Sequence, residues 1–335
     1  MTFLAGLSLS FAVLASLPAS RGRADAAGAA VAASRAQALA GRWEDAERLL
    51  SRELERPGRA DPTGRARLLA ERGRVLADRN AYGRRDPVSA RRALEEALAA
   101  ARDARDPRSE ADALQALAQM RYGETFETGD WAGVRTDFER VAAMRERDGD
   151  RRGLSESLFY LGLTYEQDGR PDDALPIYRR SLEIARELGD GAMESYPRRH
   201  IGGIEEERGE LDAAEREISM SLELRRQAGA LVVLPFAMLQ KADFLERRRG
   251  RREEARRLVE EAIDAAEAGR SPRALAAARL ELSRMLEESG SRKRALRYAG
   301  CARDAVVAFG DPADIRRAEE RIGELRARMA AASGR

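Results

Sequence analysis

The chain has 335 residues, 35% charged and 43% hydrophobic, and its formal net charge of +2 gives no overall attraction to nucleic acid or acidic membranes. One cysteine and one histidine exclude an internal disulfide and supply too few ligands for a zinc site. The sequence has no nucleophile–base pair, glycine-rich phosphate loop or metal cluster, so we expect no enzyme, no cofactor and no metal.

The N-terminus carries an apolar run over residues 3–17 that ends before Pro18, and residues 24–26 place alanines at the spacing of a signal-peptidase site. No Lys or Arg precedes the run, and Arg21 follows it, the reverse of the usual charge order. Three alternatives are a cleaved secretory signal, an uncleaved anchor of about 20 residues that just spans a membrane, and a hydrophobic first helix. A cleaved signal is favoured, so residues 1–26 are expected to be a signal peptide or an N-terminal membrane anchor.

A step from a glycine to a small residue five positions later recurs along the rest of the chain. It places anchors at intervals of 40–44 residues, at Ala46, Ala90, Val134, Ala174, Ala214, Ala255 and Ala295. At Ala90 the glycine, Gly83, lies two residues too early. A near-constant period in this range predicts a solenoid of stacked repeats.

The residues four and seven positions after each anchor share its helix face, and all are apolar or small except Glu53. The fourth position holds Leu50, Leu94, Phe138, Tyr178, Ile218, Val259 and Ala299. The pattern predicts helix pairs whose second helix begins about four residues before its anchor. A glycine such as Gly169 should end the preceding helix, because a left-handed conformation is strained for other residues.

Two consecutive repeats between residues 155 and 222 carry the most complete pattern. The first holds Leu161, Gly162, Tyr165, Gly169, Ala174 and Tyr178, and the second holds Ile201, Gly202, Gly209, Ala214 and Ile218, with Glu205 in place of the tyrosine. This pattern resembles the tetratricopeptide repeat (TPR) family in its long form of about 40 residues. The resemblance implies an all-α, right-handed superhelical solenoid of about seven antiparallel helix pairs over residues 27–310.

Residues 311–335 lie beyond the last repeat. One apolar stripe runs along residues 313–329, formed by Ile315, Ala318, Ile322, Leu325 and Met329. It predicts a C-terminal capping helix that solvates the last repeat, followed by a frayed tail. The turn loops at residues 78–89 and 121–131 are expected to be lengthened and to account for the two 44-residue intervals.

In the TPR family the first helix of each pair lines a concave groove that binds a peptide or a partner helix. Transferring the family's groove positions onto this sequence gives candidates in repeats four to six that are expected to be exposed. They are Phe159, Leu163, Gln167, Tyr196, Arg199, Glu206, Glu207, Gln240, Phe244, Arg247 and Arg248. The alternative for each is an ordinary solvated or inter-repeat residue. The set is unlike the Lys/Asn/Arg carboxylate clamp of chaperone-binding relatives, so it does not favour a C-terminal peptide carboxylate.

Charge is uneven between repeats five and six. Residues 204–217 sum to −5, from six Glu and one Asp against two Arg, and residues 246–257 sum to +4, from seven Arg against three Glu. The favoured interpretation is mutual neutralisation at a solvated turn. A phosphate or nucleic-acid patch is the alternative, and interleaved Glu and missing stacking aromatics count against it. We therefore expect no nucleic-acid partner.

The leading hypothesis is a non-catalytic protein-interaction scaffold that binds a peptide or partner protein in the concave groove. The apolar N-terminus places it in the periplasm, outside the cell, or tethered at a bacterial envelope. The alternative is a cytosolic TPR-type regulatory or sensor module of a signalling or transcription-control system. Against this alternative, the chain has no helix-turn-helix, P-loop or protease segment of the kind found beside such modules.

Overall fold

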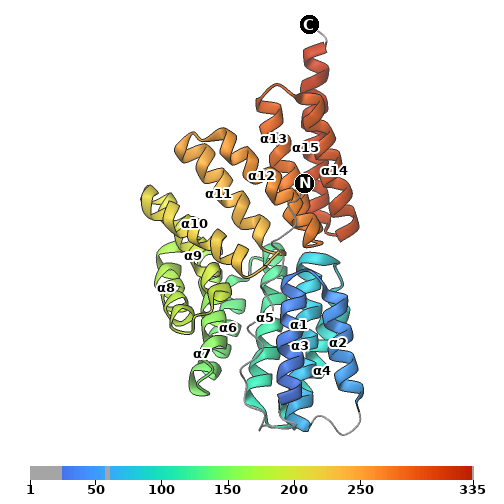
Figure 1. The fold of residues 1–335 in the computed structure, drawn as a ribbon, viewed down its shortest axis with the longest axis vertical. Helices are drawn as coiled ribbons and strands as arrows, with labels where there is room; N and C mark the ends of the chain where they lie inside the picture. Colours follow the sequence, from blue (N-terminus) through green and yellow to red (C-terminus); the bar gives the residue numbers. More distant parts are fainter. Residues whose placement is uncertain (1–24, 57–60, 334–335) are drawn as a thin grey trace, which may run out of the picture.

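The computed structural model describes residues 25–56 and 61–333, and over these ranges it is built from α-helices and one short π-helix, without strands (Figure 1). Seven consecutive helix pairs and one further helix confirm the predicted all-α solenoid. The first helices of the pairs are α1 (Asp25–Leu39), α3 (Pro62–Asp78), α5 (Pro107–Thr128), α7 (Arg151–Gln167), α9 (Gly191–Glu207), α11 (Leu234–Arg249) and α13 (Pro272–Glu288). The second helices are α2 (Trp43–Glu55), α4 (Pro87–Asp103), α6 (Trp131–Arg147), α8 (Pro171–Glu187), α10 (Leu211–Gln227), α12 (Arg252–Ala268) and α14 (Arg292–Phe309). The π-helix η1 (Arg79–Gly83) follows α3, and α15 (Pro312–Ser333) follows the seventh pair.

The signal or anchor expected over residues 1–26 falls almost wholly on residues 1–24, outside the described residues. It therefore stays a prediction. Among the described helices, none is long and apolar enough to cross a membrane. The first helix pair is formed by α1 and α2.

The anchors lie at the centre of the packing between helices. Each second helix begins three residues before its anchor, as α8 does before Ala174. All seven anchors and the residues four positions later are at most 1% exposed. A Cβ added to Gly162 would lie 2.6 Å from Tyr178, and one added to Gly202 would lie 2.8 Å from Ile218. Small residues that face large ones therefore set the spacing of the helices in each pair.

Glycines end the first helices where the sequence predicts. Gly169 and Gly209 adopt left-handed conformations, with φ of +72° and +78°. After Gly169, the Arg170 amide donates to the Tyr165 carbonyl at 2.9 Å, which closes the turn and directs α8 back along α7.

The two segments expected as long loops are largely helical. Residues 79–83 form η1, which continues the end of α3. The expected loop over residues 121–131 is wrong, because α5 continues to Thr128 and only two residues separate it from α6. Tyr122 explains the extra length: its ring centroid lies 5.4 Å from that of Phe126 and 5.7 Å from that of Trp131. These contacts stabilise the additional helical turn.

The C-terminal helix α15 covers the seventh pair. Ala318 and Leu325 are fully buried and Ile322 is 7% exposed, so the predicted apolar stripe packs against α13 and α14. The frayed tail expected within residues 328–335 stays a prediction: α15 continues to Ser333, and residues 334–335 lie outside the described residues.

The array also closes on itself, which its sequence pattern does not predict. The Val232 amide in the α10–α11 turn donates to the Leu39 carbonyl of α1 at 3.3 Å. Residues of this turn and of α1 share one buried apolar cluster. Farther along, Arg85 forms an ion pair of 2.6 Å with Asp311, before α15. The first two helix pairs therefore contact the later turns, as the adjoining blue and red helices in Figure 1 indicate, and the inner face becomes partly enclosed.

Candidate functional site

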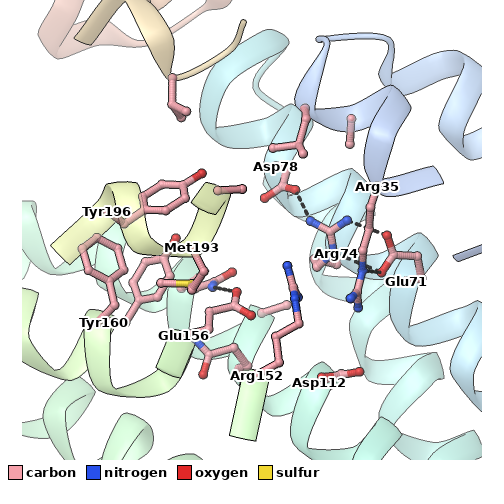
Figure 2. Close-up of a pocket in the computed structure, with 18 of the residues that line it drawn as sticks. Arg35, Glu71, Arg74, Asp78, Asp112, Arg152, Glu156, Tyr160, Met193 and Tyr196 are labelled. Atoms are coloured by element: carbon pink, nitrogen blue, oxygen red, sulfur yellow. Dashed lines mark hydrogen bonds and ion pairs between the residues drawn. The ribbon is translucent and has the colours of Figure 1, made fainter. Parts of the chain in front are cut away.

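A cavity of about 150 Å³ lies on the inner face of the array (Figure 2). Its walls come from the first helices of the first five pairs, with Trp43, Tyr82 and Arg145 between them. Val232 and Val233 of the α10–α11 turn cover it. The closure of the array therefore turns an open concave surface into a defined site.

One wall is a buried charged cluster on α3. Glu71, Arg74 and Asp78 follow one another at helical spacing, so all three face the cavity. Arg74 Nη1 lies 2.7 Å from Asp78 Oδ2, and Arg35 Nε of α1 lies 3.1 Å from Glu71 Oε2. Glu71 is 3% exposed; burial alone would raise its pKa, but Arg74 and Arg35 outweigh burial and lower it. Burial raises the pKa of Asp78 to about 6 despite Arg74.

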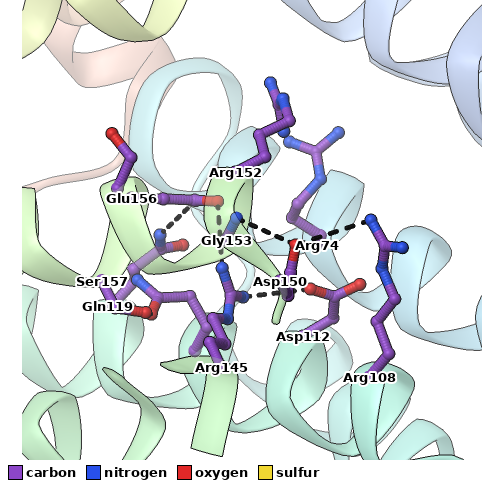
Figure 3. Close-up of polar contacts among 12 residues, drawn as sticks. Arg74, Arg108, Asp112, Gln119, Arg145, Asp150, Arg152, Gly153, Glu156 and Ser157 are labelled. Atoms are coloured by element: carbon purple, nitrogen blue, oxygen red, sulfur yellow. Dashed lines mark hydrogen bonds and ion pairs between the residues drawn. The ribbon is translucent and has the colours of Figure 1, made fainter. Parts of the chain in front are cut away.

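A second charged group forms the floor, between α5, α6 and α7 (Figure 3). Arg145 Nη2 donates to Asp112 Oδ1 at 3.0 Å, and Arg145 Nη1 lies 3.8 Å from Glu156 Oε2. Gln119 Nε2 donates to Glu156 Oε1 at 3.0 Å. Burial would raise the pKa of Glu156, but Arg145 and Arg152 lower it overall. Burial raises the pKa of Asp112 above its ordinary value, against the influence of Arg145.

Some donors of the floor have no hydrogen-bond acceptor among the described residues. They are Nε2 of Gln115 and both Nε and Nη1 of Arg145. Each of these two residues is 2% exposed, so bulk water does not solvate them. Buried polar groups are normally hydrogen-bonded, so these donors are under-satisfied, and with less than 1 Å² of accessible surface each they do not themselves border the cavity.

The opposite wall is aromatic. The ring of Phe159 lies 5.2 Å from Tyr160 and 5.3 Å from Tyr196, and Met193 lies beside them in Figure 2. Burial raises the pKa values of Tyr82, Tyr160 and Tyr196, so their hydroxyls stay protonated. None of these three hydroxyls forms a hydrogen bond within the described part of the chain. The wall thus offers ring surface together with free hydroxyl groups.

Only two of the predicted groove residues line this cavity, Phe159 and Tyr196. Phe159 is 4% exposed, so the prediction that it is exposed is wrong. It contributes only a small part of its apolar ring to the cavity lining. Leu163 is 7% exposed and packs among α8 and α9 instead of facing a groove. Phe244 is wrong as an exposed candidate: it is fully buried against Ala214 and Ile218.

The remaining groove candidates are mostly paired with other parts of the chain. Arg247 pairs with Asp243 at 2.6 Å, and Arg248 pairs with Glu206 at 2.8 Å. Gln240 Nε2 donates to the Arg199 carbonyl at 2.9 Å. Gln167 and Glu207 are exposed at helix ends.

The acidic and basic stretches of repeats five and six neutralise each other, which confirms the favoured interpretation. Glu215 Oε1 lies 3.0 Å from Lys241 Nζ, and Glu215 Oε2 lies 2.9 Å from Arg249 Nε. Burial would raise the pKa of Glu215, but Lys241 and Arg249 lower it overall.

The histidine belongs to a structural cluster. His200 Nδ1 lies 2.9 Å from Glu166 Oε2, and the Tyr178 hydroxyl donates to the same carboxylate at 2.6 Å. Arg199 Nη1 lies 3.2 Å from His200 Nε2. An arginine can only donate, so Nε2 accepts and Nδ1 carries the proton. Burial lowers the pKa of His200 despite Glu166, so the neutral ring joins α7, α8 and α9.

Sequence reasoning missed most of the cavity. The missed residues are Arg35, Glu71, Arg74, Asp78, Tyr82, Asp112, Gln115, Gln119, Arg145, Arg152, Glu156, Tyr160 and Met193. Polar residues at helical spacing on the first helices were an available signal. Asp112, Gln115 and Gln119 have this spacing in α5, on a face that would otherwise be apolar.

Comparison with known proteins gives one match to a family model. Residues 125–187 match the model of the tetratricopeptide repeat. This match spans one part of the array, α6 and α8 included, and the rest of the chain shares the fold of such repeats. No curated protein matches it in sequence.

Two solved TPR-like structures resemble the whole array. The structure of Rap protein complexed with competence and sporulation factor is 12% identical, with a TM-score of 0.55, and the match covers 91% of this chain and 98% of that one. The structure of NprR in complex with its cognate peptide NprX is 15% identical, with a TM-score of 0.56, and the match covers 90% of this chain and 87% of that one. At these identities the similarity concerns the fold alone, which is that of a TPR-like solenoid.

Proposed function

We propose that this protein is a non-catalytic scaffold that binds a peptide segment of a partner in the inner cavity. The observation that carries the proposal is the cavity on the inner face of the array, where the buried ion pairs of Glu71 and Arg145 lie opposite the rings of Tyr160 and Tyr196. Convergent polar groups beside apolar surface are typical of binding sites. The small cavity favours an extended segment over a folded domain.

The fold comparisons support a peptide as the ligand class. The Rap structure was determined with competence and sporulation factor and the NprR structure with its cognate peptide, and both match about nine-tenths of this chain. Their chemistry is not carried over residue by residue, because the identities are too low. What supports the transfer is the position of the cavity on the inner face of a similar solenoid.

Two cellular settings fit a scaffold of this kind. The apolar run over residues 3–17 favours export or tethering at a bacterial envelope. The similarity to NprR and Rap favours the alternative, a cytosolic regulatory or sensor module. N-terminal sequencing of the native protein separates them: a chain that begins near Ala27 supports export, and an intact Met1 in the cytosolic fraction supports the regulatory module.

The binding proposal is tested by selecting peptides from a displayed random library on the purified full chain. The selection is repeated on Tyr196→Ala, which removes part of the aromatic wall, and on Arg247→Glu, which changes a side chain outside the cavity. Enriched sequences should disappear with Tyr196→Ala and persist with Arg247→Glu. Equal enrichment on all three proteins would contradict binding in the cavity.

A further inference from the structure

Three carboxylates that border the cavity remain open to a ligand. The side chains of Asp78, Asp112 and Glu156 are 29%, 27% and 26% exposed, whereas that of Glu71 is 2% exposed. Asp78 Oδ2 accepts from Arg74, but Oδ1 accepts from no described residue. Oδ2 of Asp112 and Oε2 of Glu156 likewise receive no hydrogen bond from the described part of the chain. Each of these three oxygens keeps accessible surface, so a ligand in the cavity that brings donors can reach them.

The balance of charge around the cavity favours an added cation. The lining holds four arginines and four carboxylates, and Arg152 takes a further carboxylate, that of Asp190, from outside the lining. Burial alone would lower the pKa of Arg152, but Glu156 and Asp190 raise it. Burial raises the pKa values of Asp78 and Asp112, and their arginine partners do not reverse this. Arg152 is thus well compensated, whereas the two aspartates are not.

Two arginines offer donors to a competing anion. Arg35 and Arg152 use only Nε in their hydrogen bonds to Glu71 and Asp190, so their Nη atoms have no acceptor among the described residues. An anion beside them would also lie near the three open carboxylates, which repel it. A cation meets a smaller obstacle, because the long side chains of Arg35 and Arg152 are 34% and 46% exposed and can turn toward solvent.

The aromatic wall suits the same ligand. Figure 2 shows Tyr160 and Tyr196 on one side of the cavity and Asp78 on the other. The faces of aromatic rings attract cations, and a tyrosine hydroxyl can accept a hydrogen bond from an N–H group. Over the described ranges, no group of three or more Asp, Glu, His or Cys side chains could hold a metal ion, so an organic cation is favoured over a metal.

We infer that the cavity recognises a primary ammonium group of the peptide, which donates to Asp78 and the neighbouring open carboxylates and lies against the rings of Tyr160 and Tyr196. A primary ammonium has three N–H donors and no acceptor, so it matches oxygens that lack donors on three separate helices. A lysine side chain or a free amino terminus can supply it. This inference rests on the proposed function, because it specifies the chemical group by which the peptide is recognised.

The test uses acetylated, amidated pentapeptides with alanine at every position except the centre, added to the full chain and followed by ligand-observed NMR. The centre is lysine, glutamate or norleucine, which has the carbon chain of lysine without the ammonium. The lysine peptide should bind at least about tenfold more tightly than the norleucine peptide, and the glutamate peptide should bind no more tightly than norleucine. A norleucine peptide with a free amino terminus tests the other source: a gain over its acetylated form assigns the ammonium to the terminus. If neither ammonium improves binding over acetylated norleucine, the inference is overturned.

Asparagine substitutions test the assigned carboxylates. Asp78→Asn keeps the side-chain shape and should reduce the preference for the ammonium over norleucine from about tenfold to about threefold or less. Asp112→Asn makes the same change from α5 and should act in the same direction, so the test does not depend on one variant folding. Asp212→Asn is the control on an exposed ion pair and should leave the preference unchanged. Melting curves show which variants fold, and a full preference in the folded Asp78 and Asp112 variants would overturn the inference.

The peptide series also separates this inference from the proposed function. If peptides bind the unmodified chain but not Tyr196→Ala, and show no preference for an ammonium, only this inference fails. If no peptide binds in a Tyr196-dependent way, the proposed function fails as well.

Discussion

Two regions of the array mix arginines with carboxylates, and they differ in what surrounds the charges. The cavity wall holds Glu71 with its side chain 2% exposed, between Arg35 and Arg74. The surface between repeats five and six holds Asp212 with its side chain 85% exposed, paired with Arg249. Exposed pairs gain little because water and salt screen them, whereas buried groups must be satisfied within the protein. Charge density in the sequence marks the second region, but burial makes the first region a candidate site.

The largest expected effect lies beneath the charged surface of repeats five and six. Phe244→Ala should lower the free energy of unfolding by about 3–5 kcal/mol, because the ring is fully buried against Ala214 and Ile218. Urea denaturation measures this loss. Phe126→Ala is the matched control: that ring is 60% exposed, so its loss should cost less than about 1 kcal/mol. A stable Phe244→Ala protein that no longer binds peptide would restore Phe244 to the binding surface.

The next effect should come from the buried carboxylate of the cavity. Glu71→Gln keeps the side-chain shape but removes the charge that Arg35 and Arg74 contact. It should lower the free energy of unfolding by about 1.5–3 kcal/mol, the range for a hydrogen bond to a charged group. Asp212→Asn makes the equivalent change at an exposed pair and should barely move the urea midpoint. Equal effects of the two substitutions would remove the contrast between the regions.

A pH dependence should distinguish the cavity carboxylates from those on the surface. Burial raises the pKa of folded Asp78 to about 6 from an ordinary value of 3.8, so its protonated form favours the folded state. Its contribution to stability is present below pH 3.8 and is lost as the pH rises toward 6. Asp78 faces Arg74, Glu71, Arg35 and Glu156, whose charges modify this titration.

Asp78→Asn isolates the titration from that of its neighbours. The full shift corresponds to about 3 kcal/mol at 1.36 kcal/mol per pKa unit, and partial exposure of the carboxyl reduces the expected effect to about 1–2 kcal/mol. The variant should gain this much stability relative to the unmodified protein between pH 4 and pH 7, measured by urea denaturation at both values. A difference that stays constant over this range would mean that Asp78 titrates as an exposed carboxyl does.

The fold was predictable because each repeat contains the same local sequence pattern. Residues such as Ala174 and Tyr178 recur at a helical spacing and bury against a glycine of the partner helix. Gly169 adopts the left-handed conformation that the turn after α7 requires. These features depend only on neighbours in sequence, so periodicity alone reveals the helix pairs.

The site was predictable only in part, because it depends on contacts between distant repeats. Tyr196 could be assigned to the inner face from its column in the first helix. The lining by Val232 could not, since it requires α1 to meet the α10–α11 turn almost 200 residues away. Phe244 lies on the same helix as exposed candidates, yet it is buried because the small residue Ala214 opposite leaves room for its ring. The position of a residue within its repeat thus predicts which face of a helix it occupies. Which of these faces line a cavity depends on the closure of the array.

The smallest expected effect is at the surface pair of Arg248 and Glu206, 2.8 Å apart. Glu206 raises the pKa of Arg248, but this arginine is 45% exposed in its side chain and water screens the interaction. Arg248→Ala should leave the urea midpoint unchanged at physiological salt and lower it slightly at low ionic strength, where screening is weaker. Peptides selected on the unmodified protein should bind this variant with the same Kd. If Arg248→Ala abolished peptide binding while the fold stayed intact, the binding surface would lie on repeats five and six, and the buried cavity would be a structural feature of the closed array.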